Sequence, residues 1–331
     1  MAGRRRKKSG GRSYAWRYRG RIVACVFVEV IIICALVIMI GWNKGVKEWF
    51  EQFEQPVLKE VDISGINSPN AILMQARGGK ILGEINGEAQ IYPASMTKIM
   101  TVILGIENFD DLDEKITLTN EMFSGLYEQD ATQAGFQPWE EVRVIDLLYG
   151  AMLPSGAECC IALADTISGS EADFAELMNK KARKLGMENT HFCDSTGLHN
   201  PDHYSTVKDI AVLMKYCIKN DTFREIVETS RHSTGVTNIH PDGITYYSTM
   251  FKNLSDPTVT GGKILGGKTG YTSEAGHCLV SFAEIEGREY IFVSAGASGA
   301  DGNTIPHIQD AVTVYNRVGA AVEAKMNDNN K

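Results

Sequence analysis

The order of sequence patterns along residues 70–325 constrains the fold more than any other feature. Two short strand-like runs come first, a long helical block follows, and two further strand-like runs and one helix come last. Strands from the two ends of such a chain bury their apolar faces best in one shared sheet, with the helices between them forming a separate lobe. The sequence therefore predicts an α+β fold, with an antiparallel sheet flanked by helices and an inserted all-α lobe.

Apolar periodicity and turn residues give the individual elements. The first two strands are joined by Arg77-Gly78-Gly79, and the last two by Glu286-Gly287-Arg288. The predicted strands are 71–76, 80–85, 277–285 and 290–295, and the predicted helices are 95–106, 142–152, 157–167, 171–185, 207–227 and 305–325.

Charge is distributed unevenly along the chain. Residues 1–21 contain nine Lys or Arg and no acid, which leaves 24 basic against 41 acidic residues, a formal charge of −17, in the remainder. An acidic body argues against nucleic acid as a partner. The basic segment directly precedes an apolar run, so we interpret it as a topology signal.

That apolar run, residues 22–40, is interrupted only by Glu29. As a helix it would span roughly 28 Å, enough to cross a bilayer. The positive-inside rule then places the N-terminus in the cytoplasm and the rest outside, as a single-pass membrane protein. A cleaved signal peptide is the alternative, but no small-residue cleavage site follows the run. The predicted organisation is a basic cytoplasmic segment (1–21), a transmembrane anchor (22–42), a stalk (43–68), a catalytic domain (69–327) and a polar tail (328–331).

The cysteines do not form a disulfide framework. Two of the seven, Cys25 and Cys34, fall in the apolar run, and five lie beyond it. The odd number outside and the adjacent pair Cys159 and Cys160 indicate mostly reduced, buried thiols.

Ser95-Met96-Thr97-Lys98 is the first motif that carries chemistry. A serine three residues before a lysine at a helix start places both side chains on one face. There the lysine amine can take the proton of the hydroxyl, provided that burial keeps the amine neutral. A second copy, Ser205-Thr206-Val207-Lys208, has the features of a helix cap. A plain N-cap serine is the alternative at Ser95 also.

Lys268-Thr269-Gly270 is the second motif. It follows two further glycines, and strand alternation sends Lys268 and Gly270 to one face. A glycine-rich strand edge allows a peptide substrate to lie against it as an added strand, with Lys268 and Thr269 beside a carboxylate. Lys268 would also supply a second positive charge near Lys98. The alternative is a glycine-rich turn with a solvated lysine.

Ser155 follows Pro154 where two helical runs break. A serine at such a break can project into a cleft and pass a proton to a leaving amine, or simply cap the next helix. His199 and His203 are separated by Pro201 and Asp202, which spoil the helix that a zinc pair would need. No nucleotide-binding fingerprint is present, so we predict neither a metal nor a cofactor.

These motifs together resemble those of serine-type D-alanyl-D-alanine carboxypeptidases, the low-molecular-mass penicillin-binding proteins. The likeness covers about residues 57–325. It implies a β-lactamase/transpeptidase-like fold. The matching strings are Pro93-Ala94-Ser95-Met96-Thr97-Lys98, Pro154-Ser155-Gly156, Thr196-Gly197-Leu198-His199, His203-Tyr204-Ser205-Thr206 and Gly267-Lys268-Thr269-Gly270-Tyr271-Thr272.

The resemblance implies roles for these residues. Ser95 would attack the penultimate D-Ala carbonyl of a peptidoglycan stem pentapeptide, Lys98 would activate it, and Ser155 would relay a proton as the terminal D-Ala leaves. The residues Lys268, Thr269, Gly270, Tyr271 and Thr272 would bind substrate, with the N–H groups of Ser95 and Tyr271 as the oxyanion hole. β-Lactams would acylate the same serine.

Two departures from the family's pattern stand out. The middle motif of the family usually reads Ser-x-Asn, and here Ala157 replaces the asparagine. Many relatives also carry a further β-rich domain and a C-terminal amphipathic anchor. A β-lactamase is one alternative function, although the Glu-x-x-Leu-Asn string of the class A enzymes is missing. A non-catalytic wall-binding protein that retains the fold is the other.

Overall fold

The computed structural model describes residues 58–299 and 305–329. The predicted anchor and most of the predicted stalk lie outside these residues. Within them, no helix is both long and apolar enough to cross a bilayer. The described residues belong to the compact unit that begins at Val57.

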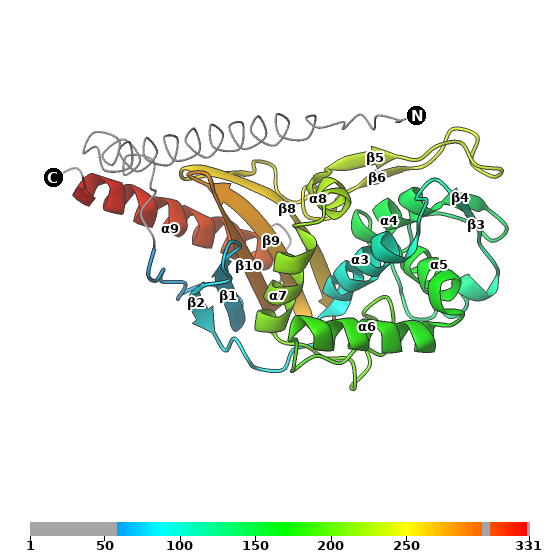
Figure 1. Ribbon diagram of the computed structural model, residues 1–331, viewed down its shortest axis with the longest axis horizontal. Coiled ribbons are helices and arrows are strands. Elements are labelled where there is room, and N and C mark those ends of the chain that lie inside the picture. The colour runs from blue at the N-terminus through cyan, green and yellow to red at the C-terminus, as the bar shows by residue number, and fades with distance from the viewer. Residues whose placement is uncertain (1–57, 300–304, 330–331) are drawn as a thin grey trace, which may run out of the picture. The chain divides into compact units, whose positions relative to one another are not determined.

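An antiparallel sheet forms the centre of this unit (Figure 1). Its strand order is β2-β1-β10-β9-β8-β7, so the first strands of the domain pair with the last ones. Met74, for example, lies opposite Ile291. The strands are β1 (Asn70–Gln75), β2 (Ile81–Ile85), β7 (Thr258–Val259), β8 (Gly262–Thr272), β9 (Gly276–Ile285) and β10 (Arg288–Ala297). This confirms the predicted α+β fold and both predicted hairpins.

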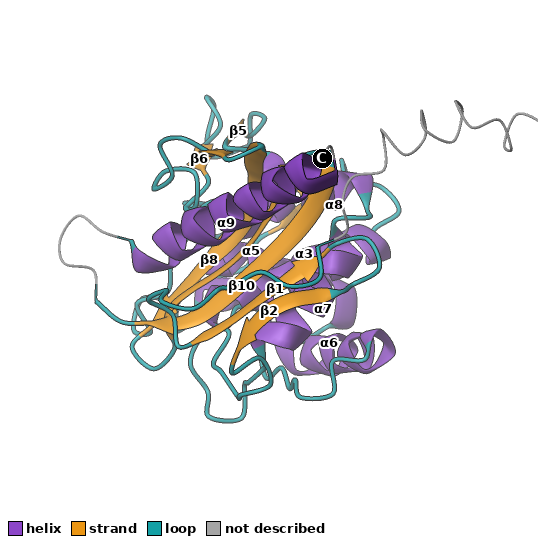
Figure 2. Ribbon diagram, turned by 90° about the vertical axis from the view of Figure 1, so that its left-hand side faces the viewer, coloured by secondary structure: helices purple, strands orange, loops and turns teal. Residues whose placement is uncertain are grey.

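Helices cover both faces of the sheet (Figure 2). On one face lies α9 (Pro306–Asn329), whose buried residues Val314, Tyr315 and Val318 pack in one apolar cluster with Leu73 and Phe292 of the sheet. The other face packs against the helical lobe. That lobe and its neighbours comprise η1 (Ala94–Thr97), α3 (Lys98–Asn108), η2 (Glu121–Phe123), α4 (Val144–Met152), α5 (Ala157–Ser168), α6 (Glu171–Leu185), α7 (Val207–Cys217) and α8 (Asp221–Glu228).

Two separate two-stranded antiparallel sheets complete the described structure. One pairs β3 (Lys115–Thr117) with β4 (Glu141–Arg143), and the other pairs β5 (Arg231–Ser233) with β6 (Thr245–Tyr247). The predicted helix 142–152 therefore begins at Val144, because the residues before it pair as a strand.

The predicted helix 207–227 is wrong as one helix. The chain breaks after Cys217, and the side chain of Asn220 caps α8 by accepting a hydrogen bond from the Phe223 N–H. Apolar periodicity continues across the break, which explains why the pattern alone did not reveal it. An asparagine N-cap was the missed signal.

The segment just before β1 packs on the domain. Leu58, Val61 and Ile63 are buried in the cluster beneath α9. Asp310 of α9 accepts hydrogen bonds from the backbone and side chain of both Asn67 and Ser68. Residues 58–68, which the sequence assigned to the end of a stalk, are thus bound to the domain.

Candidate active site

Ser95 lies in η1, directly before α3. Its Oγ accepts a hydrogen bond from the Nζ of Lys98 at 3.0 Å, and the same Nζ donates to the carbonyl oxygen of Thr196 at 2.7 Å. The first turn is a 3₁₀ helix rather than the predicted start of an α-helix. One turn still brings the hydroxyl and the amine together, because their residues are three apart.

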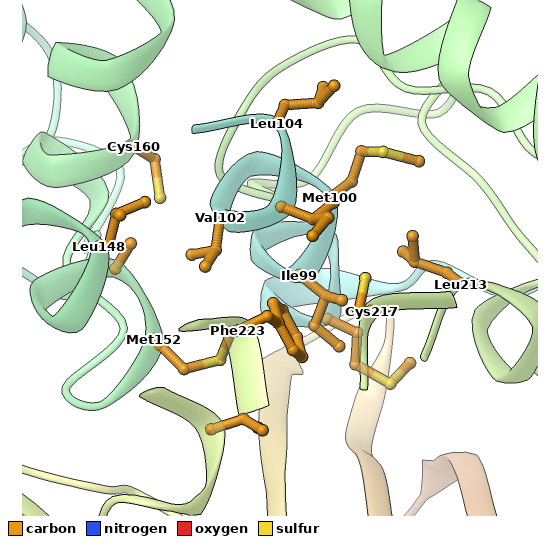
Figure 3. Packing of buried hydrophobic residues seen from close by; sticks show 14 of the residues in the cluster. Ile99, Met100, Val102, Leu104, Leu148, Met152, Cys160, Leu213, Cys217 and Phe223 are labelled. Carbon is orange, nitrogen blue, oxygen red and sulfur yellow. The ribbon is translucent and has the colours of Figure 1, made fainter. Parts of the chain in front are cut away.

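The surroundings of α3 bury Lys98. Apolar side chains of α3 such as Ile99 and Val102 point into a core shared with α4, α7 and α8 (Figure 3). Only 4% of Lys98 is exposed, and this burial lowers its pKa. Nearby acidic groups, including Cys160 and Asp194, offset part of the effect. A lysine with a lowered pKa can be neutral, as a general base must be.

Lys268 lies on β8 and is also buried. Its Nζ donates to the Oγ of Ser155 at 3.0 Å and to the carbonyl oxygen of Thr269 at 2.8 Å. Burial lowers its pKa well below the usual value, and the charge of Lys98 lowers it further. We had expected the second ammonium to act on Lys98. In the structure burial is the main cause at Lys98, and the repulsion acts on the pKa of Lys268.

Ser155 lies at the break between α4 and α5, as predicted from Pro154-Ser155-Gly156. Its φ of +72° is in the left-handed region, which is unusual for a residue with a side chain. Such a conformation persists only where the surrounding structure holds it. The hydroxyl accepts a hydrogen bond from Lys268, and only 6% of the residue is exposed.

Glycines allow β8 to approach Ser95 closely. A Cβ on Gly270 would come within 3.0 Å of the backbone nitrogen of Ser95. Beyond Lys263, β8 pairs with β9 on one side, and among the described strands none pairs with its other edge. Lys268 and Gly270 are buried while Thr269 and Tyr271 are more exposed, as strand alternation predicts.

A cleft of about 500 Å³ opens between this strand and the lobe. Five of the predicted site residues line this cleft: Ser95, Ser155, Thr269, Gly270 and Tyr271. Thr272 of the predicted set does not line it, and Lys98 and Lys268 lie behind the lining. The full lining is Ser95, Asp130, Thr132, Pro154, Ser155, Thr249, Asn253, Thr269, Gly270, Tyr271, His277, Ile305 and His307.

Several of these lining residues were not predicted from the sequence. The hydroxyl of Thr249 lies 2.6 Å from that of Thr269. Thr132 belongs to the loop after η2, and His307 comes from the start of α9. None of them stands in a motif, so no local sequence signal could have identified them.

The second Ser-x-x-Lys copy has no place in the cleft. The side chain of Thr206 caps α7 by accepting from the Asp209 N–H, which confirms the predicted cap. Lys208 pairs with Glu88 on the surface. What distinguishes the two copies is therefore not the motif itself. Lys98 is buried whereas Lys208 lies at the surface, and Ser95 lines the cleft whereas Ser205 does not.

Ala157, at the position of the family's asparagine, is the first residue of α5 and is buried. Its N–H donates to the carbonyl oxygen of Thr132 at 2.8 Å. The neighbouring Glu158 points away from the cleft, and its Oε1 accepts from the N–H groups of Ala134 and Gly135. As expected from helical geometry, Glu158 does not replace the missing amide.

The described residues offer no group of three or more His, Cys, Asp or Glu side chains placed to hold a metal ion. Five cysteines of this part are free thiols, four of them buried.

Comparison with known proteins identifies the family. The model of the D-alanyl-D-alanine carboxypeptidase family matches residues 57–299. The chain belongs to this family. Bacillus subtilis DacF, a D-alanyl-D-alanine carboxypeptidase, is 34% identical over 233 residues, which cover 69% of this chain and 57% of DacF. Escherichia coli DacC, with the same description, is 32% identical over 72% of this chain and 58% of DacC. The chain thus spans somewhat less than three fifths of the length of these two carboxypeptidases.

Solved structures of the family have the same fold. The Streptomyces K15 DD-transpeptidase superposes with a TM-score of 0.69 at 29% identity, covering 79% of this chain and all of that one. A D-alanyl-D-alanine carboxypeptidase from Mycobacterium tuberculosis reaches the same TM-score at 21% identity, covering 80% of this chain and 96% of that one. The curved antiparallel sheet with its helical lobe is therefore the fold of this family.

Proposed function

We propose that this protein is a serine D-Ala-D-Ala carboxypeptidase that removes the terminal D-Ala from peptidoglycan stem pentapeptides. The observation that carries the proposal is the 3.0 Å hydrogen bond between the buried Lys98 amine and the Ser95 hydroxyl. A serine so placed is an activated nucleophile without a histidine. Family membership supplies the substrate class.

In the acylation step, neutral Lys98 takes the proton of Ser95 as Oγ bonds to the penultimate D-Ala carbonyl carbon. The negative charge that develops on the carbonyl oxygen is stabilised by the N–H groups of Ser95 and Tyr271. The carbon–nitrogen bond then breaks. The leaving amine receives the proton through Ser155, whose hydroxyl Lys268 orients at 3.0 Å. Water attacks the resulting ester, and a tetrapeptide is released.

Substrate binding is assigned to the free edge of β8. The peptide would add to this edge as a strand, with Gly270 leaving room beside Ser95. Thr269, partly exposed in the cleft, would contact the terminal carboxylate, with Tyr271 of the same lining next to it. Lys268 is buried behind Thr269, and it would assist binding through its hydrogen bonds to the Ser155 hydroxyl and the Thr269 carbonyl oxygen, which hold both groups in place.

For the N-terminal part we retain the proposal made from the sequence. Residues 22–42 would form a single transmembrane anchor, with 1–21 in the cytoplasm and the catalytic domain outside the cell membrane. Peptidoglycan lies on that side of the membrane. Partners would thus be the stem peptide, β-lactam inhibitors and the membrane, with no nucleic acid and no cofactor.

A labelling experiment with a fluorescent penicillin tests the proposal. We expect stable covalent labelling of the wild type, none of Ser95→Ala, and release of D-Ala from a pentapeptide by the wild type alone. Rapid loss of the label would indicate a β-lactamase. Labelling without D-Ala release, under the same conditions, would count against the carboxypeptidase, and the absence of any labelling would indicate a non-catalytic wall-binding protein.

A further inference from the structure

A buried histidine lies behind the nucleophile without touching it. His203 is 2% exposed, and its Nε2 lies 2.9 Å from the Oγ1 of Thr97. Thr97 stands between Ser95 and Lys98 and is completely buried. Because a hydroxyl both donates and accepts, this hydrogen bond forms with either neutral tautomer of His203.

The other ring nitrogen of His203 contacts a carboxylate. Its Nδ1 lies 3.1 Å from the Oδ2 of Asp194. Burial alone would raise the pKa of Asp194, but its hydrogen bonds with His203 and with the donors of Thr196 lower it to about 2. Asp194 is thus an anion that holds the imidazole in place.

The same carboxylate organises the loop that receives Lys98. The Oδ1 of Asp194 accepts hydrogen bonds from the N–H and hydroxyl of Thr196 and from the N–H of Gly197, each at 2.7 Å. The carbonyl oxygen of Thr196 in turn accepts from the Lys98 amine. Asp194 therefore fixes one of the two acceptors that orient this amine.

Close packing connects the loop to η1. Gly197 has a φ of +81°, and a Cβ there would come 1.9 Å from the carbonyl oxygen of Ala94. Thr97 has helical backbone angles where η1 passes into α3, and its hydroxyl is engaged by His203.

We propose that His203 is a positioning residue, which bridges the Asp194 carboxylate to the Thr97 hydroxyl and thereby fixes the turn that carries Ser95 and Lys98. It acts from the buried side and contacts no reacting atom. The inference rests on the proposed function. It adds a residue that supports Ser95 and Lys98 and that has no role in the motif assignments above. An error of even 1 Å in such a turn can reduce a rate by about 100-fold.

Two substitutions of His203 separate positioning from mere space filling. The amide of glutamine in His203→Gln reaches about where Nε2 lies, so it can keep the bond to Thr97. The shorter amide of His203→Asn reaches about where Nδ1 lies, so it keeps only the contact with Asp194. The readout is penicillin acylation, resolved into the non-covalent dissociation constant and the acylation rate constant, with thermal unfolding measured alongside.

We expect His203→Asn to lower the acylation rate constant by about 30-fold with an unchanged dissociation constant, and His203→Gln to stay within about threefold of the wild type. Thr97→Val removes the same hydrogen bond from the other side, and we expect it to match His203→Asn, with Thr97→Ser restoring the rate. In a double-mutant cycle, His203→Asn should cost little more once Thr97 is valine.

Equal losses in both His203 variants, or additive effects with Thr97→Val, would overturn the positioning role. So would full acylation of a folded His203→Asn protein. If His203→Asn does not fold, Thr97→Val and Thr97→Ser decide the question alone. A wild type that no penicillin acylates would overturn the proposed function, whereas a reactive wild type with a fully reactive Thr97→Val variant would overturn only the inference about His203.

Discussion

The Nζ of Lys268 lies 3.0 Å from the Oγ of Ser155, although 113 residues separate them in the chain. This contact joins β8 to the break between α4 and α5. Both partners are almost fully buried. The Ser155 hydroxyl and the β8 strand are therefore positioned by one another.

Ser155→Gly separates activity from backbone strain. Glycine adopts a φ of +72° without strain, whereas alanine keeps the strain and, like glycine, lacks the hydroxyl. We expect both variants to acylate about 100-fold more slowly with penicillin. In urea unfolding, Ser155→Gly should be more stable than Ser155→Ala by about 1 kcal/mol. Equal stability of the two would show that the left-handed conformation costs nothing.

Lys98 variants test the general base. Lys98→Met removes the amine, and Lys98→Arg replaces it with a guanidinium that stays charged. We expect both to lower the acylation rate about 1,000-fold. Because burial lowers the pKa of Lys98, wild-type acylation should rise with pH along a limb below the usual lysine value of about 10.4. Rapid acylation of Lys98→Arg would exclude this lysine as the base.

Ala157→Asn tests the departure from the family's middle motif. Ala157 is buried in the apolar core and is absent from the lining of the cleft. We therefore expect the asparagine to lower the free energy of unfolding by about 1–3 kcal/mol, since its amide must lose water. D-Ala release should stay within about threefold of the wild type. A large increase in turnover would instead mean that the missing amide handicaps the enzyme.

From the surroundings of His307 we expect the free energy of unfolding to fall in mild acid. Its ring stacks on that of His277 at 5.0 Å, and its Nδ1 has no hydrogen-bond partner in the described structure. Burial, and then the charge of His277, lowers the pKa of His307 to about 4. The unfolded chain, with a pKa near 6.5, thus binds the proton more readily. The stabilising effect of the neutral ring is complete above about pH 6.5 and is lost as the pH falls toward 4.

The measurement is the free energy of unfolding at pH 7.5 and pH 5. We expect His307 alone to account for about 2 kcal/mol of the wild-type loss between these values. The unfolding free energy of His307→Gln should lack this part of the pH dependence. Penicillin acylation of the variant serves as a check that it is folded. Parallel curves for the two proteins would show that His307 is not the responsible group.

The sequence predicted the fold well where periodicity and turns agree. The hairpin at Glu286-Gly287-Arg288 and helix Glu171–Leu185 are found as predicted, since each is bounded by a clear turn or cap. The break before Asn220 was missed because apolar spacing continued through it. Packing of Leu58 against the sheet was also missed, since a short irregular segment has no period to read.

The contacts of the site also include some that the sequence predicts and some that it does not. The Ser95–Lys98 contact follows from helical spacing, whereas the contact between Lys268 and Ser155 was not predicted. The network of Asp194, His203 and Thr97 joins three separate segments, and only the folded chain reveals it. Short-range chemistry can be predicted from spacing, whereas partners brought in by tertiary packing cannot.

Pairing between β1 and β10 has a consequence for biosynthesis. Residues 70–75 of β1 can pair with β10 only after residues 290–295 have been synthesised, so the middle of the sheet forms late. Because the chain is made from its N-terminus, Ser95, Lys98 and the helical lobe are synthesised long before β8 and β10. A chain that ends before β8 would lack one wall of the cleft. If the proposed function holds, we expect such a chain to be inert toward penicillin, so that acylation would report completion of the domain.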